Sequence, residues 1–393
     1  MMINIRTLDQ LQLSAGNRVF YRVDYNVPLE GTRITDATRI EETLPTLRLL
    51  RERGAAIVLA SHLGRPKGER KSKYSLEPVR ARLEELIGVP VQWADDCVGV
   101  DTSRLKAGEL MLLENLRFHP GEEKNDAAFA AELRRLADFY VNDAFGACHR
   151  AHASIDALPR LFEKDHTAGG LLLAKELEFL QKVTNVSDRP FVALLGGAKI
   201  AGKIEPLEAL MKLADRVLVG GGMANTFLAA RGVPMGGSLV DTDSLDVARR
   251  IMETGARAEL ELPADLVVAD SLDAPAEIEE IDVAEGLTED AKAFDIGSKT
   301  VAAFTAELKG AKTIFWNGPM GVFEKEEFAK GTIAMARAVA EADAISVVGG
   351  GESVEAVKAS GFADRITHIS TGGGASLEFI AGASLPGVEV LKA

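Results

Sequence analysis

One pattern recurs along most of the chain and restricts its fold more than any other feature. A short apolar run rich in β-branched residues stops at a loop of Gly, Asn, Asp, Arg or His, and a helical pattern follows. Amphipathic stretches lie between the runs, at residues 40–53, 76–87, 126–137 and 330–341. Alternation of buried strands with helices predicts an α/β fold with parallel sheets covered on both faces. The runs read RVFYRVDYN, AAIVLASHLGRP, ELMLLENLRF, DFYVNDAFG, PFVALLGGAK, DRVLVGGGMAN, ADLVVADS, KTIFWNGP, AISVVGGGES and ITHISTGGG.

Ten such runs exceed the usual number of strands in one sheet, so we expect two domains. Four runs precede residue 150 and six follow residue 190. Between them, residues 169–185 (GGLLLAKELEFLQKVTN) read as one helix opened by two glycines. Because this segment is not rich in Ser and Pro, we expect an inter-domain helix and not a flexible linker. Ligands of parallel sheets bind beyond the carboxyl ends of the strands, where most of the unusual residues of this chain stand.

Composition excludes several classes of protein. The net charge of −14 argues against general binding to nucleic acid or to an anionic membrane. Cys97 and Cys148 are the only cysteines, so no disulfide framework and no Cys-based zinc spacing is expected. The first residues, MMINIRTLDQL, lack the pattern of a signal peptide, and no run of about 18 apolar residues occurs. We therefore expect a reduced, cytoplasmic protein.

The strand ends of the first half are basic. Guanidinium groups match phosphate and carboxylate groups bidentately, so arginines at separate strand ends suit a small anion that carries both. Taken singly, each Arg could be a surface salt-bridge partner. Taken together with the polar residues beside them, they predict an anion site. His119 and His166 lack this context and are expected to be ordinary surface histidines. The candidate residues are Asp24, Asn26, Arg39, His62, Arg65, Arg117, His149, Arg150 and His152.

The strand ends of the second half are rich in glycine instead. Backbone N–H groups at helix N-termini bind phosphate, and glycine permits its close approach. One glycine cluster is a weak signal, because most are turns, but clusters at successive strand ends indicate a phosphate site. None fits G-x-G-x-x-G. The clusters lie at residues 196–197, 220–222, 318 and 321, 349–351 and 372–374.

The segment GGAKIAGKIEP (196–206) has the spacing of a Walker-type phosphate loop, but Ile204 stands where that loop needs a hydroxyl for Mg²⁺. Lys199 and Lys203 are spaced i, i+4, which predicts that both project from one face of a helix's first turn. Cations are unfavourable there, because the helix dipole is positive at its N-terminus, so an anion between them is expected. Two solvated lysines, or a P-loop with a lost metal ligand, are the alternatives.

Nine segments together resemble the phosphoglycerate kinases. In that family's order the chain has RVDYNVP, SHLGRPKG, ENLRF, NDAFGACHRAHAS, GGAKIAGKI, VGGGMANTF, FWNGPMGVFE, GGGES and STGGGASLEF, which span about residues 20 to 380. The resemblance implies two similar-sized Rossmann-like lobes joined by a helix and hinge. The implied parts are an N-terminal 3-phosphoglycerate-binding domain (1–168), the inter-domain helix (169–185), a C-terminal nucleotide-binding domain (186–375) and a tail that returns to the first domain (376–393).

The resemblance also implies the reaction: reversible, Mg²⁺-dependent phosphoryl transfer between 1,3-bisphosphoglycerate and ADP, giving 3-phosphoglycerate and ATP in glycolysis and gluconeogenesis. Two lobes that hold two ligands must close to bring the reacting oxygens in line, so we expect hinge bending at the 169–185 helix, and lobes that hinge freely suit a monomer. Under this reading GGAKIAGK is no Walker loop, and Ile204 is not a lost ligand.

Site residues carried over by motif fall into three groups. The implied substrate residues are Asp24, Asn26, Arg39, His62, Leu63, Gly64, Arg65, Arg117 and Arg150. The implied nucleotide residues are Gly197, Lys199, Lys203, Gly221, Asn317, Glu324, Gly350, Gly351, Glu352 and Ser353, with Glu324 on the ribose hydroxyls. The implied catalytic residues are Arg39, Lys199, Lys203, Gly351 and Gly374.

This chain departs from the family pattern in three places. Glu352 stands where Asp is usual in GGGD, and it is the expected contact of the Mg²⁺–nucleotide; Glu reaches one methylene further, and Mg²⁺ is strict about octahedral geometry. Cys148 replaces a commoner Ser, Thr or Ala, and we expect a small packed residue and not a nucleophile. Ala201 and Gly202 replace polar residues between the two lysines.

The absence of an evident catalytic base fits this chemistry. Transfer from an acyl phosphate to ADP joins oxygens that are already ionised, so catalysis needs positioning and neutralisation of charge, which Arg39, Lys199 and Lys203 could supply. A regulatory relative that binds both ligands without turnover remains an alternative; substitution of Arg39, Lys203 or the glycine loops would be its mark, and none is substituted. A nicotinamide dehydrogenase is disfavoured, because G-x-G-x-x-G with a following acidic residue is missing.

Overall fold

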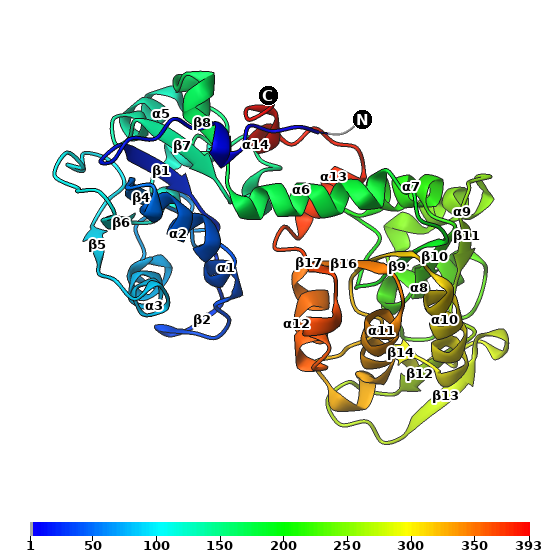
Figure 1. The fold of residues 1–393 in the computed structure, drawn as a ribbon. Coiled ribbons are helices and arrows are strands. Elements are labelled where there is room, and N and C mark those ends of the chain that lie inside the picture. The colour runs from blue at the N-terminus through cyan, green and yellow to red at the C-terminus, as the bar shows by residue number, and fades with distance from the viewer. Residues whose placement is uncertain (1–2) are drawn as a thin grey trace. The chain divides into compact units, whose positions relative to one another are not determined.

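The computed structural model describes residues 3–393, which form two compact units (Figure 1). The first unit contains the chain up to Glu178 together with Ser384–Ala393, and the second contains Phe179–Ala383. No helix among the described residues is both long enough and apolar enough to cross a membrane.

The first unit is built on a six-stranded sheet in the order β5-β6-β4-β1-β7-β8, and every neighbouring pair is parallel. Arg22, the last residue of β1, is level with Ala60 on one neighbour and Asn142 on the other. The loops after these strands therefore start at one edge of the sheet. The strands are β1 (Arg18–Arg22), β4 (Ala56–Ala60), β5 (Val91–Ala94), β6 (Leu110–Leu113), β7 (Phe139–Asn142) and β8 (Thr167–Gly169).

Helices and one hairpin surround this sheet. The stretch predicted at 40–53 forms two helices, since Pro45 has no N–H to continue the hydrogen-bond ladder. The third helix ends at Gly88, whose φ of 73° is left-handed. The elements are α1 (Thr38–Glu41), α2 (Leu44–Glu52), α3 (Glu77–Ile87), α4 (Pro120–Glu123), α5 (Ala127–Arg134), and the antiparallel pair β2 (Leu29–Glu30) and β3 (Arg33–Ile34).

The predicted inter-domain helix is α6 (Leu171–Thr184), whose residues up to Glu178 lie in the first unit. Two side chains satisfy its first backbone donors: Thr46 Oγ1 accepts from Leu171 N at 2.8 Å, and Asp143 Oδ1 accepts from Leu173 N at 2.9 Å. A Cβ on Gly170 would lie 2.2 Å from Asp143 Oδ2. The glycine before this helix is therefore required by the approach of Asp143.

The two ends of the described chain meet in the first unit. Arg6 N donates to Leu391 O at 2.9 Å, and Ile5 pairs with Lys392 in an antiparallel bridge. The short helix α14 (Pro386–Glu389) lies against the loop after β7, where Gly387 N donates to Cys148 O at 3.0 Å. Residues 376–383, which the sequence assigned to the returning tail, belong to the second unit.

The second unit contains a six-stranded parallel sheet in the order β11-β10-β9-β15-β16-β17. Its core is apolar, with Trp316 among the largest buried side chains. The strands are β9 (Phe191–Leu195), β10 (Arg216–Val219), β11 (Glu259–Glu261), β15 (Thr313–Asn317), β16 (Ile345–Gly349) and β17 (His368–Ile369). The helices are α7 (Ile204–Leu213), α8 (Gly221–Ala230), α9 (Leu245–Glu253), α10 (Ser298–Gly310), α11 (Lys330–Glu341), α12 (Gly351–Ala359) and α13 (Gly374–Ile380).

One strand prediction is wrong. The run ADLVVADS forms β12 (Asp265–Ala269), which does not join the parallel sheet but lies between two antiparallel partners. These are β13 (Ile278–Asp282) and β14 (Lys292–Ile296). The loop from β12 to β13 is too short for a parallel crossover, which takes a dozen or more residues. A strand buried on both faces has the same apolar run in either kind of sheet, so periodicity could not separate them.

Candidate active site

A cluster of charged side chains occupies the edge of the first unit's sheet where β1 and β4 end. Arg39 Nη1 donates to Asp24 Oδ2 at 2.6 Å, and His62 Nε2 lies 3.8 Å from Asp24 Oδ1. Burial alone would raise the pKa of Asp24, but the charges of Arg39 and Arg22 hold it at about 2. Burial, with the nearby arginines, lowers the pKa of His62 well below its usual value. The cluster therefore holds an ionised carboxylate and a neutral imidazole at neutral pH.

Hydrogen bonds shape the loop after β4. Asn26 Oδ1 accepts from Gly64 N at 2.8 Å, and Arg117 Nη1 donates to Gly64 O at 3.0 Å. The Asn115 side chain donates to Leu63 O at 2.8 Å and accepts from Arg117 N at 3.0 Å. Residues from the ends of β1, β4 and β6 are thus fixed to one another. Leu63 contributes its backbone here, because its side chain is buried in the core.

Arg117, in η3 (Leu116–Phe118), is the most deeply buried of the predicted substrate arginines, with 5% of the residue exposed. Burial and the charge of Arg22 lower its pKa to about 10, so the group stays charged at neutral pH. Its Nε makes no hydrogen bond among the described residues and lies 3.8 Å from Glu123 Oε1. A buried guanidinium with an unused N–H is poised to bind an anion.

The remaining predicted residues of this edge are less constrained. Arg150 is half-buried and donates from Nε to His149 Nε2 at 3.0 Å. Its charge acts on Arg117, which places it near the cluster. Arg65 is exposed, and no hydrogen bond or ion pair among the described residues ties it to the others. Burial and the surrounding arginines lower the pKa of His152 to about 3. His119 and His166 lie outside this set but are half-buried and not simply surface residues.

Sequence reasoning missed Arg22. Its side chain is fully buried; Nε donates to Ser154 Oγ at 2.8 Å, and Nη2 lies 3.3 Å from His62 Nδ1 and 3.8 Å from Glu122 Oε1. Glu122 in turn accepts from Ser154 Oγ at 2.6 Å. Arg22 supplies positive charge beneath the site without reaching the surface. The sequence signal that could have identified Arg22 is a charged residue at the end of an apolar strand.

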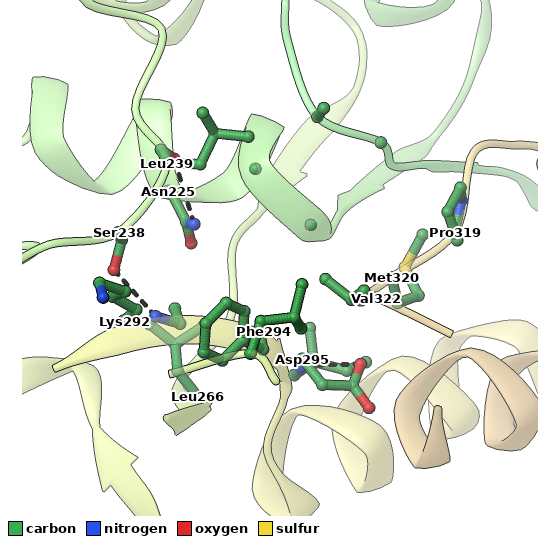
Figure 2. Close-up of a pocket in the computed structure, with 18 of the residues that line it drawn as sticks. Asn225, Ser238, Leu239, Leu266, Lys292, Phe294, Asp295, Pro319, Met320 and Val322 are labelled. Carbon is green, nitrogen blue, oxygen red and sulfur yellow. Dashed lines mark hydrogen bonds between the residues drawn. The ribbon is translucent and has the colours of Figure 1, made fainter. Parts of the chain in front are cut away.

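The second unit contains a cavity of about 670 Å³ beside the carboxyl ends of its strands (Figure 2). Four residues predicted for nucleotide binding line it: Gly197, Gly221, Glu324 and Glu352. Figure 2 shows Pro319, Met320 and Val322 across the pocket from Ser238 and Leu239, with Phe294 and Leu266 between them. The apolar part of this lining was not predicted, because it comes from loops and from β12 and β14, and neither strand carries a glycine motif.

Several glycines of the second unit have a packing reason. A Cβ on Gly196 would lie 2.0 Å from Pro319 O, and one on Gly318 would lie 2.2 Å from Gly196 O. Nothing lies within 4 Å of a Cβ built on Gly351, which begins α12 and is exposed. Gly374 begins α13 and is also exposed. The open space suits a phosphate at Gly351, whereas Gly196 and Gly318 hold strand ends together.

Two predicted nucleotide residues are buried supports of this loop. Asn317 Nδ2 donates to Gly349 O at 2.9 Å, and Ser353 Oγ accepts from Gly318 N. Gly350 has a φ of 94°, and a Cβ there would lie 2.9 Å from Asn317 Nδ2. Asn317 and Ser353 do not line the cavity but shape the loop before α12.

The prediction that Lys199 and Lys203 share the first turn of a helix is wrong. Helix α7 begins at Ile204, so Lys203 is its N-cap and Lys199 lies in the loop before it. Gly197 and Gly202 adopt φ values of 105° and 80°, which interrupt any helix here. Lys203 Nζ donates to Gly196 O at 2.8 Å, and burial lowers its pKa while Glu352 raises it. Lys199 is exposed.

The comparisons with known proteins agree along almost the entire chain. The family model described as phosphoglycerate kinase matches residues 8–383. The phosphoglycerate kinase of Solibacter usitatus is 51% identical over 99% of both chains, and that of Rubrobacter xylanophilus is 52% identical over 98% of both. Among solved structures, phosphoglycerate kinase from Coxiella burnetii matches with a TM-score of 0.88 at 37% identity, covering 99% of both chains. That of Pyrococcus horikoshii matches with a TM-score of 0.87 at 34% identity, covering 98% of both. The chain therefore belongs to the phosphoglycerate kinase family.

Proposed function

We propose that this chain catalyses reversible phosphoryl transfer between 1,3-bisphosphoglycerate and ADP, giving 3-phosphoglycerate and ATP. As a member of this family the chain is a kinase of glycolysis. The assignment of residues rests on the contrast between the two units. The first unit holds a buried cationic cluster at the ends of its strands. The second unit holds a glycine-lined cavity at the ends of its strands. Each suits one of the two anionic substrates.

The first unit's cluster is assigned to the phosphoglycerate. Arg117 and Arg150 supply positive charge. The hydrogen bond between Asn26 and Gly64 sets the shape of the loop after β4. Asp24 holds Arg39 by a 2.6 Å hydrogen bond and so orients it in the absence of substrate. His62 is neutral, so it binds as a hydrogen-bonding group and not as a cation. Arg65, on the same loop, reaches solvent and completes the set.

The second unit's cavity is assigned to the nucleotide. Its apolar residues, such as Phe294 and Leu266, suit a base, and Glu324 at its border suits the ribose hydroxyls. Gly351 at the start of α12 offers backbone N–H groups to phosphate. Lys203, half-buried, and Lys199, in the preceding loop, supply positive charge to the same end.

The chemistry needs no proton acceptor, because the attacking oxygen is ionised before the transfer and the leaving oxygen is released as an anion. Charge on the transferring group must be neutralised, and the attacking oxygen must be placed in line. Arg39, Lys199, Lys203 and the N–H groups of Gly351 and Gly374 are assigned to that neutralisation. Positioned cations of this kind accelerate phosphoryl transfer by on the order of 10³–10⁵.

The residues present fit a Mg²⁺–nucleotide. Glu352 is exposed, borders the cavity, and lies near enough to Lys203 to influence its pKa. Its carboxylate is the oxygen donor that Mg²⁺ prefers, directly or through a water molecule. When bound, Mg²⁺ supplies further charge neutralisation at the phosphates. Because Glu352 is exposed, its extra methylene relative to Asp does not have to fit into a buried space.

The proposed reaction also bears on domain motion, oligomeric state and cellular compartment. Because the two sets of residues belong to different units, transfer requires the units to approach, with α6 and its ends acting as hinge. One chain carries both sets, so a monomer suffices. Both cysteines are free and buried, which suits a reducing compartment such as the cytoplasm.

The test is a coupled NADH assay of the purified protein with ATP, Mg²⁺ and 3-phosphoglycerate, omitting 3-phosphoglycerate or Mg²⁺ in the controls. We expect turnover only when all three are present. Binding of both ligands by calorimetry without turnover would contradict the proposal and favour a regulatory relative.

A further inference from the structure

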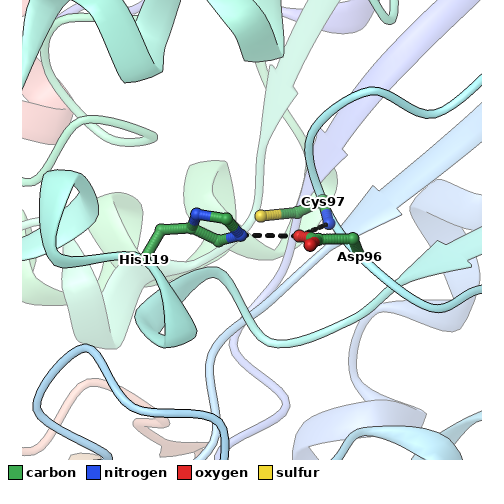
Figure 3. A group of neighbouring side chains, drawn as sticks. All are labelled: Asp96, Cys97 and His119. Carbon is green, nitrogen blue, oxygen red and sulfur yellow. Dashed lines mark hydrogen bonds and ion pairs between the residues drawn. The ribbon is translucent and has the colours of Figure 1, made fainter.

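Three potential metal ligands converge in the first unit, apart from the cationic cluster. Asp96 and Cys97 lie in the loop after β5, and His119 follows η3 (Figure 3). Their ligand atoms all lie within 4.8 Å of one another. His119 Nε2 lies 2.6 Å from Asp96 Oδ1, and Figure 3 shows the Cys97 sulfur directed toward the same space. Thiolate, imidazole and carboxylate are the ligands that Zn²⁺ takes in proteins.

The side chains are held in place without a metal. The His119 ring stacks on Phe129 with centroids 5.3 Å apart and planes 24° apart, which fixes its orientation. Cys97 N donates to Asp96 Oδ1 at 2.6 Å. Preorganised ligands of this kind lose little conformational freedom when they bind a metal.

The surroundings allow an ion to enter. Cys97 is fully buried, but 43% of the Asp96 side chain and 29% of the His119 side chain are exposed, so the open side faces solvent. Arg70 is the neighbouring cation: its Nη2 lies 3.9 Å from Asp96 Oδ2, and its guanidinium lies over Phe118. Arg70 Nη2 donates instead to Asp95 O, and its distance from Asp96 Oδ2 is too long for a hydrogen bond, so this ion pair with Asp96 is weak.

We propose that Asp96, Cys97 and His119 form a binding site for a divalent transition-metal ion of the Zn²⁺ class, separate from the Mg²⁺ that accompanies the nucleotide. Three protein ligands leave the fourth tetrahedral position to water. On binding, the Cys97 thiol releases its proton to solvent and the sulfur bonds to the metal. His119 must present Nε2 without a proton, so any proton carried there passes to Nδ1 or to solvent.

Without metal, Cys97 is an inert thiol. Burial raises its pKa, and the charges of Asp96 and Glu122 raise it further. A cation in the site reverses this balance, because it stabilises the thiolate that it coordinates. The bound ion would tie the loop after β5 to the segment that carries Arg117, two residues before His119.

The experiment titrates Co²⁺ into the metal-free, full-length protein, with a phosphine reductant and no nucleotide. Tetrahedral Co²⁺ bound to a thiolate gives a sulfur-to-metal charge-transfer band, which reports the bond directly. We expect about one equivalent of Co²⁺ to bind and Zn²⁺ to displace it. Elemental analysis after gel filtration measures the Zn²⁺ retained.

The variants are chosen as matched pairs. Cys97→Ser should remove the band, and His119→Asn should weaken binding at least about 10-fold. Cys148→Ala, at the other buried cysteine, and His166→Asn, at the other half-buried histidine that stacks on a phenylalanine, should change neither. Asp96→Asn, at a half-exposed position, tests the site even if Cys97→Ser fails to fold. No charge-transfer band in the wild type, or a band that Cys148→Ala removes, would overturn the proposal.

Discussion

Gly64 shows how a single residue fixes the geometry of the proposed phosphoglycerate site. Its φ of 61° is left-handed, and a Cβ there would lie 2.3 Å from the Tyr74 ring. Its N–H and carbonyl are bonded to Asn26 and Arg117. Displacement of this residue would therefore disturb both side chains at once.

We predict that Gly64→Ala destabilises the protein by about 1–3 kcal/mol beyond the backbone strain of about 1 kcal/mol. The KM for 3-phosphoglycerate should rise, and that for ATP should stay unchanged. Gly31→Ala is the matched control, because Gly31 has a φ of 63° but open space around its Cβ position. Thermal unfolding and steady-state kinetics compare the two. Equal effects of both substitutions would show that the contact with Tyr74 does not matter.

At the residue scale the sequence revealed the polar residues beyond the strand ends better than those within the strands. Asp24 and His62 follow β1 and β4, and Arg39 lies in α1; all three were predicted, and contacts in the structure join them. Arg22 was not assigned, although it contacts His62 and lies near Glu122. The charge partner of a residue buried in a strand is distant in sequence, so its role appears only after the chain has folded.

At the scale of elements, the start of α6 depends on Asp143. This carboxylate accepts hydrogen bonds from Leu173 N and from the hydroxyl of Tyr21, the latter at 2.7 Å. Burial raises its pKa to about 6, although hydrogen bonds from Thr46 and Leu173 oppose the shift. The folded state therefore binds this proton more tightly than the unfolded chain, where the pKa is near 3.8. Stability from this group is present below about pH 4 and is lost as the pH rises through about 6.

Asp143→Asn should lower the free energy of unfolding. We predict that this loss is about 2 kcal/mol smaller at about pH 7.5 than at about pH 4.5, because the contribution of the Asp143 proton is lost over this range and the variant never has it. The measurement is denaturant unfolding followed by fluorescence of Trp93, in a Trp316→Phe background so that the first unit alone reports. A cost that is the same at both pH values would show that Asp143 does not titrate in this range.

The N-terminus of α12 carries the proposed metal contact. We predict that Glu352→Gln raises the Mg²⁺ concentration needed for half-maximal turnover by about 10-fold or more, because the charged oxygen donor is lost. Glu352→Asp should keep activity within a few-fold of the wild type. Glu355→Gln, at an exposed position on the same helix, is the control. The assignment fails if the Glu352 and Glu355 variants need the same amount of Mg²⁺.

Long buried elements were predictable, and edges were not. Nine of the ten apolar runs form strands of the two parallel sheets, and α11 has the predicted bounds. The edge strands β5, β8 and β11 are short and partly polar or glycine-containing, so they gave no periodic signal. Helix α7 starts later than expected, because the conformations of Gly197 and Gly202 depend on tertiary contacts that sequence spacing does not reveal.

At the scale of the whole molecule, the residues proposed for the two ligands lie in two units that each have a parallel sheet and a core. Arg39 belongs to the first unit, whereas the cavity assigned to the nucleotide belongs entirely to the second. If Arg39 acts on the transferring group, its charge should matter to turnover and not to the binding of nucleotide alone.

The measurement that tests this account most directly compares kcat with the nucleotide Kd for Arg39→Gln. The account predicts a loss in kcat on the order of 10³, with the Kd for ATP from calorimetry unchanged within about twofold. Arg33→Gln, which removes an exposed arginine paired with Glu30, is the control and should leave both values unchanged. Equal losses in kcat and ATP affinity, or no loss in kcat, would contradict the assignment of Arg39 to the transition state.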